Sequence, residues 1–126
     1  MSVEYYYCTG HPSDVAMEVL RSLAFHVSPN EFVTVGITNH PEKRFDELGN
    51  DSAPSDGFGG RLVVIYEALS KDHYSQVESS IVGWLREHDY QFETEGKIDF
   101  GGSRSNGSDS GPFYVYLLLD RNSREG

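Results

Sequence analysis

Arg44 and Glu78 are the two charged residues whose sequence context points to chemistry, because each is carried by a predicted helix that follows a predicted strand. The segment GITNHPEKRF begins at Gly36, within a β-branched stretch, and Pro41 suits the first turn of the short helix that carries Arg44. An arginine makes charge-assisted hydrogen bonds to phosphate, and a glutamate can hold Mg²⁺, which keeps most of its waters. A nearby tyrosine would orient or deprotonate the attacking water. Metal-assisted phosphodiester cleavage is a reaction that requires residues of these types.

The order of strand, glycine, arginine, strand and glutamate over about residues 32–84 resembles the GIY-YIG nuclease superfamily. In that family a strand with a tyrosine-x-glycine motif leads to a helix with the catalytic arginine, and the glutamate of a later helix binds the divalent metal. The resemblance implies a Mg²⁺-dependent endonuclease that acts on nucleic acid, with Glu78 as the metal ligand. It implies three catalytic residues, Arg44, Glu78 and Tyr7. It also implies three substrate-binding residues, Thr34, Gly36 and Lys43.

The sequence departs from the family pattern at three places. Thr34 stands where the tyrosine of the second motif is expected, and Leu48 stands where many members have a histidine. The first motif of the family lies about ten residues upstream, on a strand whose pairing resembles a hairpin. Here the tyrosines at 5–7 are separated from Thr34 by a whole predicted helix, and the strand at 113–116 is the alternative for that position in space. Because a fold can persist after its chemistry is lost, a catalytically silent relative is the alternative interpretation.

Hydrophobic periodicity predicts a single domain over residues 1–119. The predicted strands are 3–8, 32–38, 61–67 and 113–119, and the predicted helices are a segment opened by Pro12, 42–48 and 71–88. The last helix is expected to bury four residues on one face, Val77, Ile81, Trp84 and Leu85. The fold class is therefore α/β, of the α+β kind, with a small mainly antiparallel sheet of three to four strands and two to three packed helices. We expect mobile loops at 49–60 and 101–111 and a disordered tail at 120–126.

Composition excludes several classes of protein. The chain has 126 residues and a formal net charge of -10, from 20 acidic and 10 basic residues, which opposes non-specific binding to nucleic acid. A single cysteine, Cys8, excludes an internal disulfide and a zinc site built from several cysteines. No apolar run approaches the roughly 18 residues that span a bilayer, and residues 1–4 show no secretory signal. We therefore expect an intracellular, cytoplasmic protein without a membrane partner.

Three classes of function fit these residues. The first is the Mg²⁺-dependent nuclease. The second is a catalytically silent, acidic binding protein that needs no cofactor and inhibits a basic, nucleic-acid-handling partner, as small anti-defence inhibitors do. The third is a module that grips a nucleotide or another small anion through Arg44. The nuclease requires Arg44, Glu78 and a tyrosine hydroxyl to converge on one cleft, whereas the inhibitor requires an acidic face.

Overall fold

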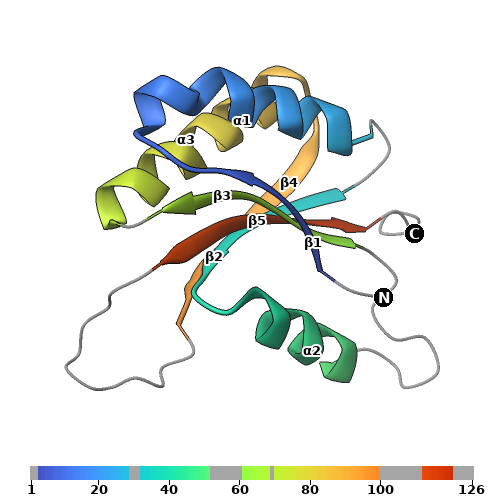
Figure 1. The fold of residues 1–126 in the computed structure, drawn as a ribbon. Coiled ribbons are helices and arrows are strands. Elements are labelled where there is room, and N and C mark those ends of the chain that lie inside the picture. Colours follow the sequence, from blue (N-terminus) through green and yellow to red (C-terminus); the bar gives the residue numbers. More distant parts are fainter. Residues whose placement is uncertain (1–2, 29–31, 52–60, 69, 100–111, 121–126) are drawn as a thin grey trace.

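The computed structural model describes residues 3–28, 32–51, 61–68, 70–99 and 112–120. These residues form one five-stranded sheet of strand order β1-β3-β5-β2-β4, together with three helices (Figure 1). The strands are β1 (Glu4–Cys8), β2 (Phe32–Thr38), β3 (Arg61–Ala68), β4 (Gln91–Ile98) and β5 (Phe113–Asp120). The helices are α1 (Pro12–His26), α2 (Pro41–Asp51) and α3 (Lys71–Glu87).

The predicted α+β class is confirmed, with two differences in the sheet. The described sheet has five strands instead of three to four, and it is mixed, because β1 with β3 and β2 with β4 pair in parallel. The strand missing from the sequence prediction is β4, whose sequence QFETEGKI is mostly polar. β4 is an edge strand with no fully buried side chain, so it needs little of the hydrophobic pattern that identifies a strand.

The two predicted loops and the predicted tail lie largely outside the described residues. Residues 49–51 belong to the end of α2, and Asp120 is the last residue of β5. The rest of 49–60, the whole of 101–111 and residues 121–126 are not among the described residues. The predictions of mobility at these segments therefore stay predictions.

The helices cover both faces of the sheet: α1 and α3 lie side by side on one face, and α2 lies on the other (Figure 1). β2 and β3 are both antiparallel to β5, so β1 to β4 all run in one direction. The chain crosses the sheet one way from β1 to β2 and from β3 to β4, and the opposite way from β2 to β3. Crossovers between parallel strands share a right-handed sense, so the reversed connection places its helix on the opposite face. None of these helices is long and apolar enough to cross a membrane.

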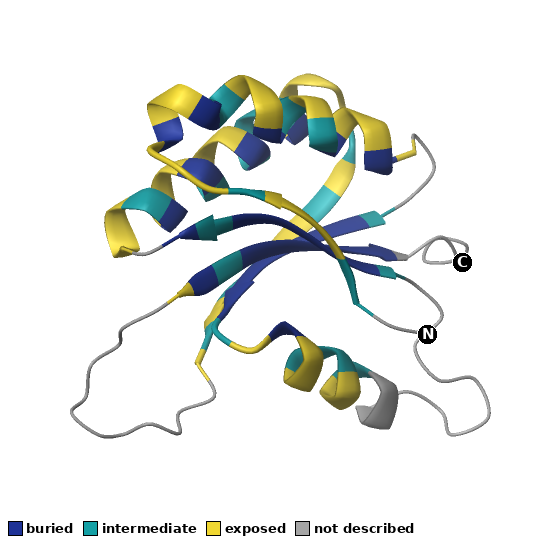
Figure 2. Cartoon of the chain, in the orientation of Figure 1, coloured by how far each residue is buried: buried dark blue, intermediate teal, exposed yellow. Residues whose placement is uncertain are grey.

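The larger core lies between the sheet and the α1–α3 layer, and its buried positions are visible in Figure 2. In α3 the buried residues recur at helical spacing, at Tyr74, Val77, Ile81 and Leu85. The predicted stripe is thus confirmed at three of its four positions. Trp84 is only half-buried and stacks on Tyr90, with 5.5 Å between the ring centroids.

A smaller core lies beneath α2. It contains four buried sheet residues, Leu62, Val64, Tyr116 and Leu118. Phe45 and Leu48 of α2 pack against them. Leu48, where the family resemblance leads us to expect a histidine, therefore anchors α2 by apolar contact.

β5 is the strand that pairs with β2 beside Gly36, one of the predicted substrate-binding residues. The two strands are antiparallel, and Tyr116 lies opposite Gly36. β1, with its three tyrosines, lies at the far edge of the sheet, separated from β2 by β3 and β5. Of the two candidates for a tyrosine-bearing strand beside β2, the structure selects β5.

Candidate functional site

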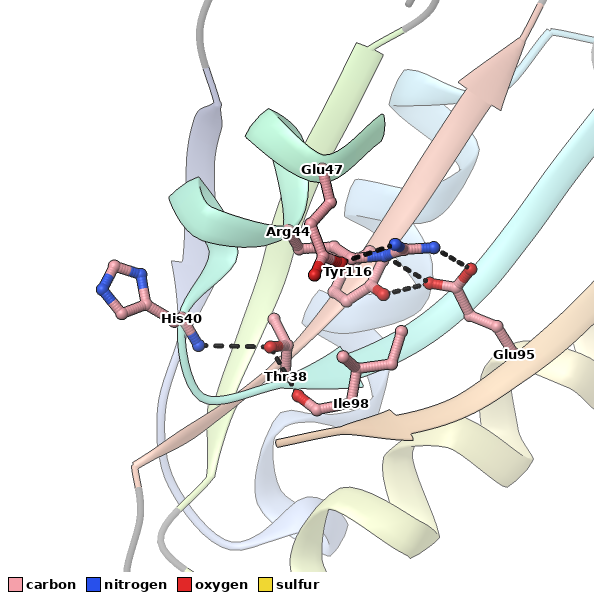
Figure 3. A network of polar contacts seen from close by, with 7 residues as sticks. All are labelled: Thr38, His40, Arg44, Glu47, Glu95, Ile98 and Tyr116. Atoms are coloured by element: carbon pink, nitrogen blue, oxygen red, sulfur yellow. Dashed lines mark hydrogen bonds and ion pairs between the residues drawn. The ribbon is translucent and has the colours of Figure 1, made fainter. Parts of the chain in front are cut away.

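Arg44 lies in a polar cluster between α2 and the sheet, here named the Arg44 cluster and made of Arg44, Glu47, Glu95 and Tyr116 (Figure 3). The Arg44 guanidinium donates to both oxygens of Glu95, with Nη2–Oε2 2.9 Å and Nε–Oε1 3.3 Å. Its Nη1 lies 3.1 Å from Oε1 of Glu47. The Tyr116 hydroxyl donates to Glu95 as well. Because Arg44 already pairs with two carboxylates, the cluster carries a net negative charge.

A bulge in β4 brings Glu95 to this position. Val35 of β2 pairs with Thr94, but the next residue, Gly36, pairs with Gly96, so Glu95 is an extra residue in β4. Gly96 has φ 76°, a left-handed backbone conformation that glycine adopts without a steric penalty. From this bulge the Glu95 carboxylate reaches Arg44 of α2.

The turn between β2 and α2 is fixed by a second set of hydrogen bonds (Figure 3). Thr38 Oγ1 donates to the carbonyl oxygen of Ile98, at 2.7 Å, and accepts from the backbone N–H of His40, at 3.2 Å. These bonds tie the start of α2 to the end of β4. β4 therefore holds the beginning of α2 through the bond between Ile98 and Thr38, and the centre of α2 through the bonds between Glu95 and Arg44.

Burial and the Glu95 carboxylate together set the protonation states of Tyr116 and Arg44. Burial and the hydrogen bond to Glu95 raise the pKa of Tyr116, which is completely buried. Burial opposes the charge on Arg44, but the hydrogen bond and the attraction of Glu95 outweigh it and raise the pKa of Arg44. At neutral pH the cluster therefore holds a neutral phenol and a paired guanidinium, so Tyr116 cannot serve as a general base.

Gly36, predicted to bind substrate, has a packing reason for its identity. A Cβ atom at this position would lie 2.5 Å from Cζ of Tyr116 and 2.8 Å from Oε1 of Glu95. The absence of a side chain lets the Tyr116 ring lie directly over β2. The glycine that the family resemblance assigns to substrate binding lies instead at a close contact between two strands.

We expect Gly36→Ala to lower the free energy of unfolding by about 1–3 kcal/mol, the usual cost of forcing extra volume into a packed site. The matched control is Gly83→Ala in α3, where a new Cβ meets nothing within 4 Å. That replacement should raise the free energy of unfolding by about 0.5–1 kcal/mol, because alanine is the better helix former. Urea denaturation of both variants measures the effects. Equal midpoints for the wild type and Gly36→Ala would contradict the packing described here.

Glu78 lies on the opposite side of the sheet from Arg44. It is half-buried on α3, where it lines a groove of about 300 Å³ together with Arg86 and Thr94. Thr94 and Glu95 are neighbours in β4 that face opposite sides, so the sheet separates Glu78 from the Arg44 cluster. Burial raises the pKa of Glu78.

The donor set around Glu78 does not fit a divalent cation. The described residues contain no group of three histidine, cysteine, aspartate or glutamate side chains that could hold a metal ion. Arg86, the other charged residue in the groove, would repel Mg²⁺. The Mg²⁺ predicted from the family resemblance therefore has no supporting ligand set in this part of the chain.

The other predicted site residues are also dispersed. Tyr7 lies on the edge strand β1 and is 41% exposed. Thr34 is buried in β2 opposite Leu118, and Lys43 is exposed on α2. Within the described residues, the structure does not assemble Arg44, Glu78 and Tyr7 into one cleft.

A different set of side chains gathers near β1, on the face of the sheet that α2 covers. We name this set the tyrosine-carboxylate face: Tyr5, Tyr7, Tyr114, Glu42 and Glu67. The ring centroids of Tyr5 and Tyr7 lie 6.3 Å apart, and those of Tyr7 and Tyr114 lie 5.8 Å apart. The Tyr5 hydroxyl donates to Glu42 and the Tyr114 hydroxyl donates to Glu67, both at 3.2 Å. Three rings and two carboxylates thus form one continuous group.

Tyr5 and Tyr114 present neutral rings at physiological pH. Burial and the hydrogen bond to Glu42 raise the pKa of Tyr5 to about 12, and burial and the charge of Glu67 raise the pKa of Tyr114. Tyr5 is 44% exposed, so its ring remains open to solvent. Aromatic faces next to carboxylates attract cations, above all the flat guanidinium of arginine.

Tyr7 could be identified from the sequence, but the residues that surround it in the tyrosine-carboxylate face could not. Glu42 and Glu67 lie in segments that carry no motif for binding. The three tyrosines are far apart in the sequence, two near residue 6 and one at 114. The usable signal was the aromatic alternation shared by residues 5–7 and 114–116.

A comparison with protein-family models finds none that matches the chain, and neither the curated proteins nor the solved structures contain a match. The likeness to GIY-YIG nucleases therefore stays a hypothesis based on the residues quoted above.

Proposed function

We propose that this chain is a catalytically silent, acidic binding domain whose tyrosine-carboxylate face engages a basic surface of a nucleic-acid-handling protein. The observation that carries the proposal is the continuous group of Tyr5, Tyr7 and Tyr114 with the carboxylates of Glu42 and Glu67. Tyrosine is enriched among the residues that dominate binding energy at protein interfaces.

Charge supports a basic protein as the partner. The chain carries a formal net charge of -10, which repels phosphate backbones and attracts surfaces rich in lysine and arginine. A surface that binds nucleic acid has that basic character, so an acidic domain seated on it would exclude the nucleic acid. Binding of this kind inhibits the partner without any chemistry in the inhibitor.

The arrangement of strands is compatible with a GIY-YIG-like scaffold that lacks an assembled active site. β5 supplies a tyrosine, Tyr116, opposite Gly36 of β2. Arg44 lies on α2, the helix that follows β2, as the family resemblance implies. Arg44 is held by Glu95 and Glu47, and Glu78 lies on the other face. These contacts favour a domain that binds a partner over one that cleaves nucleic acid.

A pull-down combined with a cleavage assay tests this proposal. The immobilised chain should retain a nucleic-acid-binding protein at low salt, and the purified partner should lose its nucleic-acid binding when the chain is added. Affinity should fall about tenfold or more as salt rises from low to several hundred millimolar, because exposed charges are screened. Plasmid DNA incubated with the chain and Mg²⁺ should stay intact. Mg²⁺-dependent cleavage that disappears in both Arg44→Ala and Glu78→Gln would overturn the proposal in favour of the nuclease.

A further inference from the structure

A cavity of about 440 Å³ lies where β1 and β3 end and where α1 and α3 begin. It is lined by Thr9, Gly10, His11, Tyr66, Glu67 and His73. β1 and β3 are parallel neighbours, and the carboxyl ends of parallel strands are a common place for ligands in α/β proteins. The Tyr66 hydroxyl donates to the carbonyl oxygen of Gly10, which ties the β1–α1 connection to β3.

Two histidines of the cavity lining lie against each other. The ring centroids of His11 and His73 lie 5.0 Å apart in an edge-to-face arrangement. Nδ1 of His11 accepts the backbone N–H of Ser13 at 3.1 Å, which places the proton of the neutral ring on Nε2. A protonated Nε2 cannot ligate a metal, and the described residues hold no group of three metal-ligating side chains.

The charge of the cavity favours a cation over an anion. The N-termini of α1 and α3 are both capped, by the His11 ring and by Ser70, and each has an acidic residue in its first turn, Asp14 and Asp72. These acidic residues offset the positive ends of the two helix dipoles. Glu67 is the acidic residue of the cavity lining, and within the described residues no lysine or arginine forms an ion pair with its carboxylate.

We propose that this cavity accepts the guanidinium of an arginine side chain from the basic partner. Glu67 would accept two parallel N–H bonds from the guanidinium, a geometry in which arginine and carboxylate match. The imidazole ring of His73, which is only half-buried, supplies a flat surface on which a guanidinium stacks. Glu67 also accepts from Tyr114, so the cavity continues directly into the tyrosine-carboxylate face. This inference rests on the proposed function and specifies the side chain that the partner inserts.

The first test uses small probes on the full chain. N-acetyl-arginine amide should shift the NMR signals of the His11 and His73 imidazoles in a saturable manner. N-acetyl-citrulline amide, which has nearly the same shape without the charge, and N-acetyl-lysine amide, which lacks the planar fork, should each bind at least about tenfold more weakly. Inorganic phosphate that shifts these signals while the arginine amide does not would overturn the inference and make the cavity an anion site.

The second test uses Glu67→Gln, which keeps the shape of the side chain and can still accept from Tyr114. It should weaken both the arginine amide and the partner by about tenfold or more, whereas Glu87→Gln, at the exposed end of α3, should weaken neither. Normal partner affinity in Glu67→Gln, together with weakened affinity in Tyr7→Ala, would overturn the inference, while the rings and Glu42 would still support the proposed function. A second outcome concerns the wild-type chain: it binds no basic partner, although the arginine amide still saturates the cavity. This result would overturn the proposed function, and the arginine could then not be assigned to a partner.

Discussion

Replacing Arg44 by alanine is expected to lower the free energy of unfolding by about 2–3 kcal/mol, somewhat less than the roughly 3–5 kcal/mol seen when a fully buried ion pair loses one partner. The side chains of Arg44 and Glu95 are only 14% and 19% exposed, so the variant would leave a carboxylate without its cation in a poorly solvated position. α2 would lose its central polar contact with the sheet. Urea denaturation measures the change.

The control for Arg44→Ala is Arg21→Ala, which removes an exposed arginine from α1 and should change stability by less than about 0.5 kcal/mol. Replacing both members of the pair, as Arg44→Met with Glu95→Leu, should recover much of the lost stability, because no unpaired charge remains. If Arg44→Ala is as stable as Arg21→Ala, Arg44 does not anchor α2 and is available for a phosphate.

Tyr7→Ala is expected to weaken partner binding about 30-fold or more, the effect typical of a central aromatic residue at an interface. Tyr7 is the middle ring of the face, in contact with both Tyr5 and Tyr114. Because it is 41% exposed on an edge strand, its loss should change the stability of the fold little. Titration of the purified partner followed by calorimetry gives the affinity.

Phe25→Ala is the matched control for Tyr7→Ala. Phe25 is an aromatic residue that is 80% exposed on α1, which lies on the other side of the sheet. Its removal should leave partner affinity unchanged. The reverse pattern, with binding lost in Phe25→Ala and kept in Tyr7→Ala, would assign the interface to the α1 side. It would exclude the tyrosine-carboxylate face as the binding surface.

Much of the fold could be predicted because its central elements are apolar. The segments that became β3 and β5 are long β-branched or aromatic runs, and α3 shows its buried stripe at helical spacing. β4 could not be predicted, since its pairing with β2 bridges about sixty residues and its side chains are mostly polar. Backbone hydrogen bonds to β2 place β4 in the sheet, and the pattern of apolar residues in the sequence gives no sign of such bonds.

The site was predicted less well than the fold, for two physical reasons. Arg44 was recognised as important, but its partner Glu95 reaches it only through a bulge in the unpredicted strand. Glu78 was assigned to the same site, although the side of the sheet that a crossover helix covers depends on strand order. Only the full strand order β1-β3-β5-β2-β4 shows that the β2–β3 and β3–β4 connections run in opposite directions, which places the helices of Arg44 and Glu78 on opposite faces.

The central claim is that the tyrosine-carboxylate face binds a basic partner, and NMR titration of the ¹⁵N-labelled chain with the purified partner tests it most directly. We predict that the largest shift changes fall on the backbone amides of Tyr5, Tyr7, Glu67 and Tyr114, and that they shrink as salt is added. Changes confined to the Arg44 cluster or to the α3 groove around Glu78, or equal changes produced by duplex DNA without the partner, would contradict the claim.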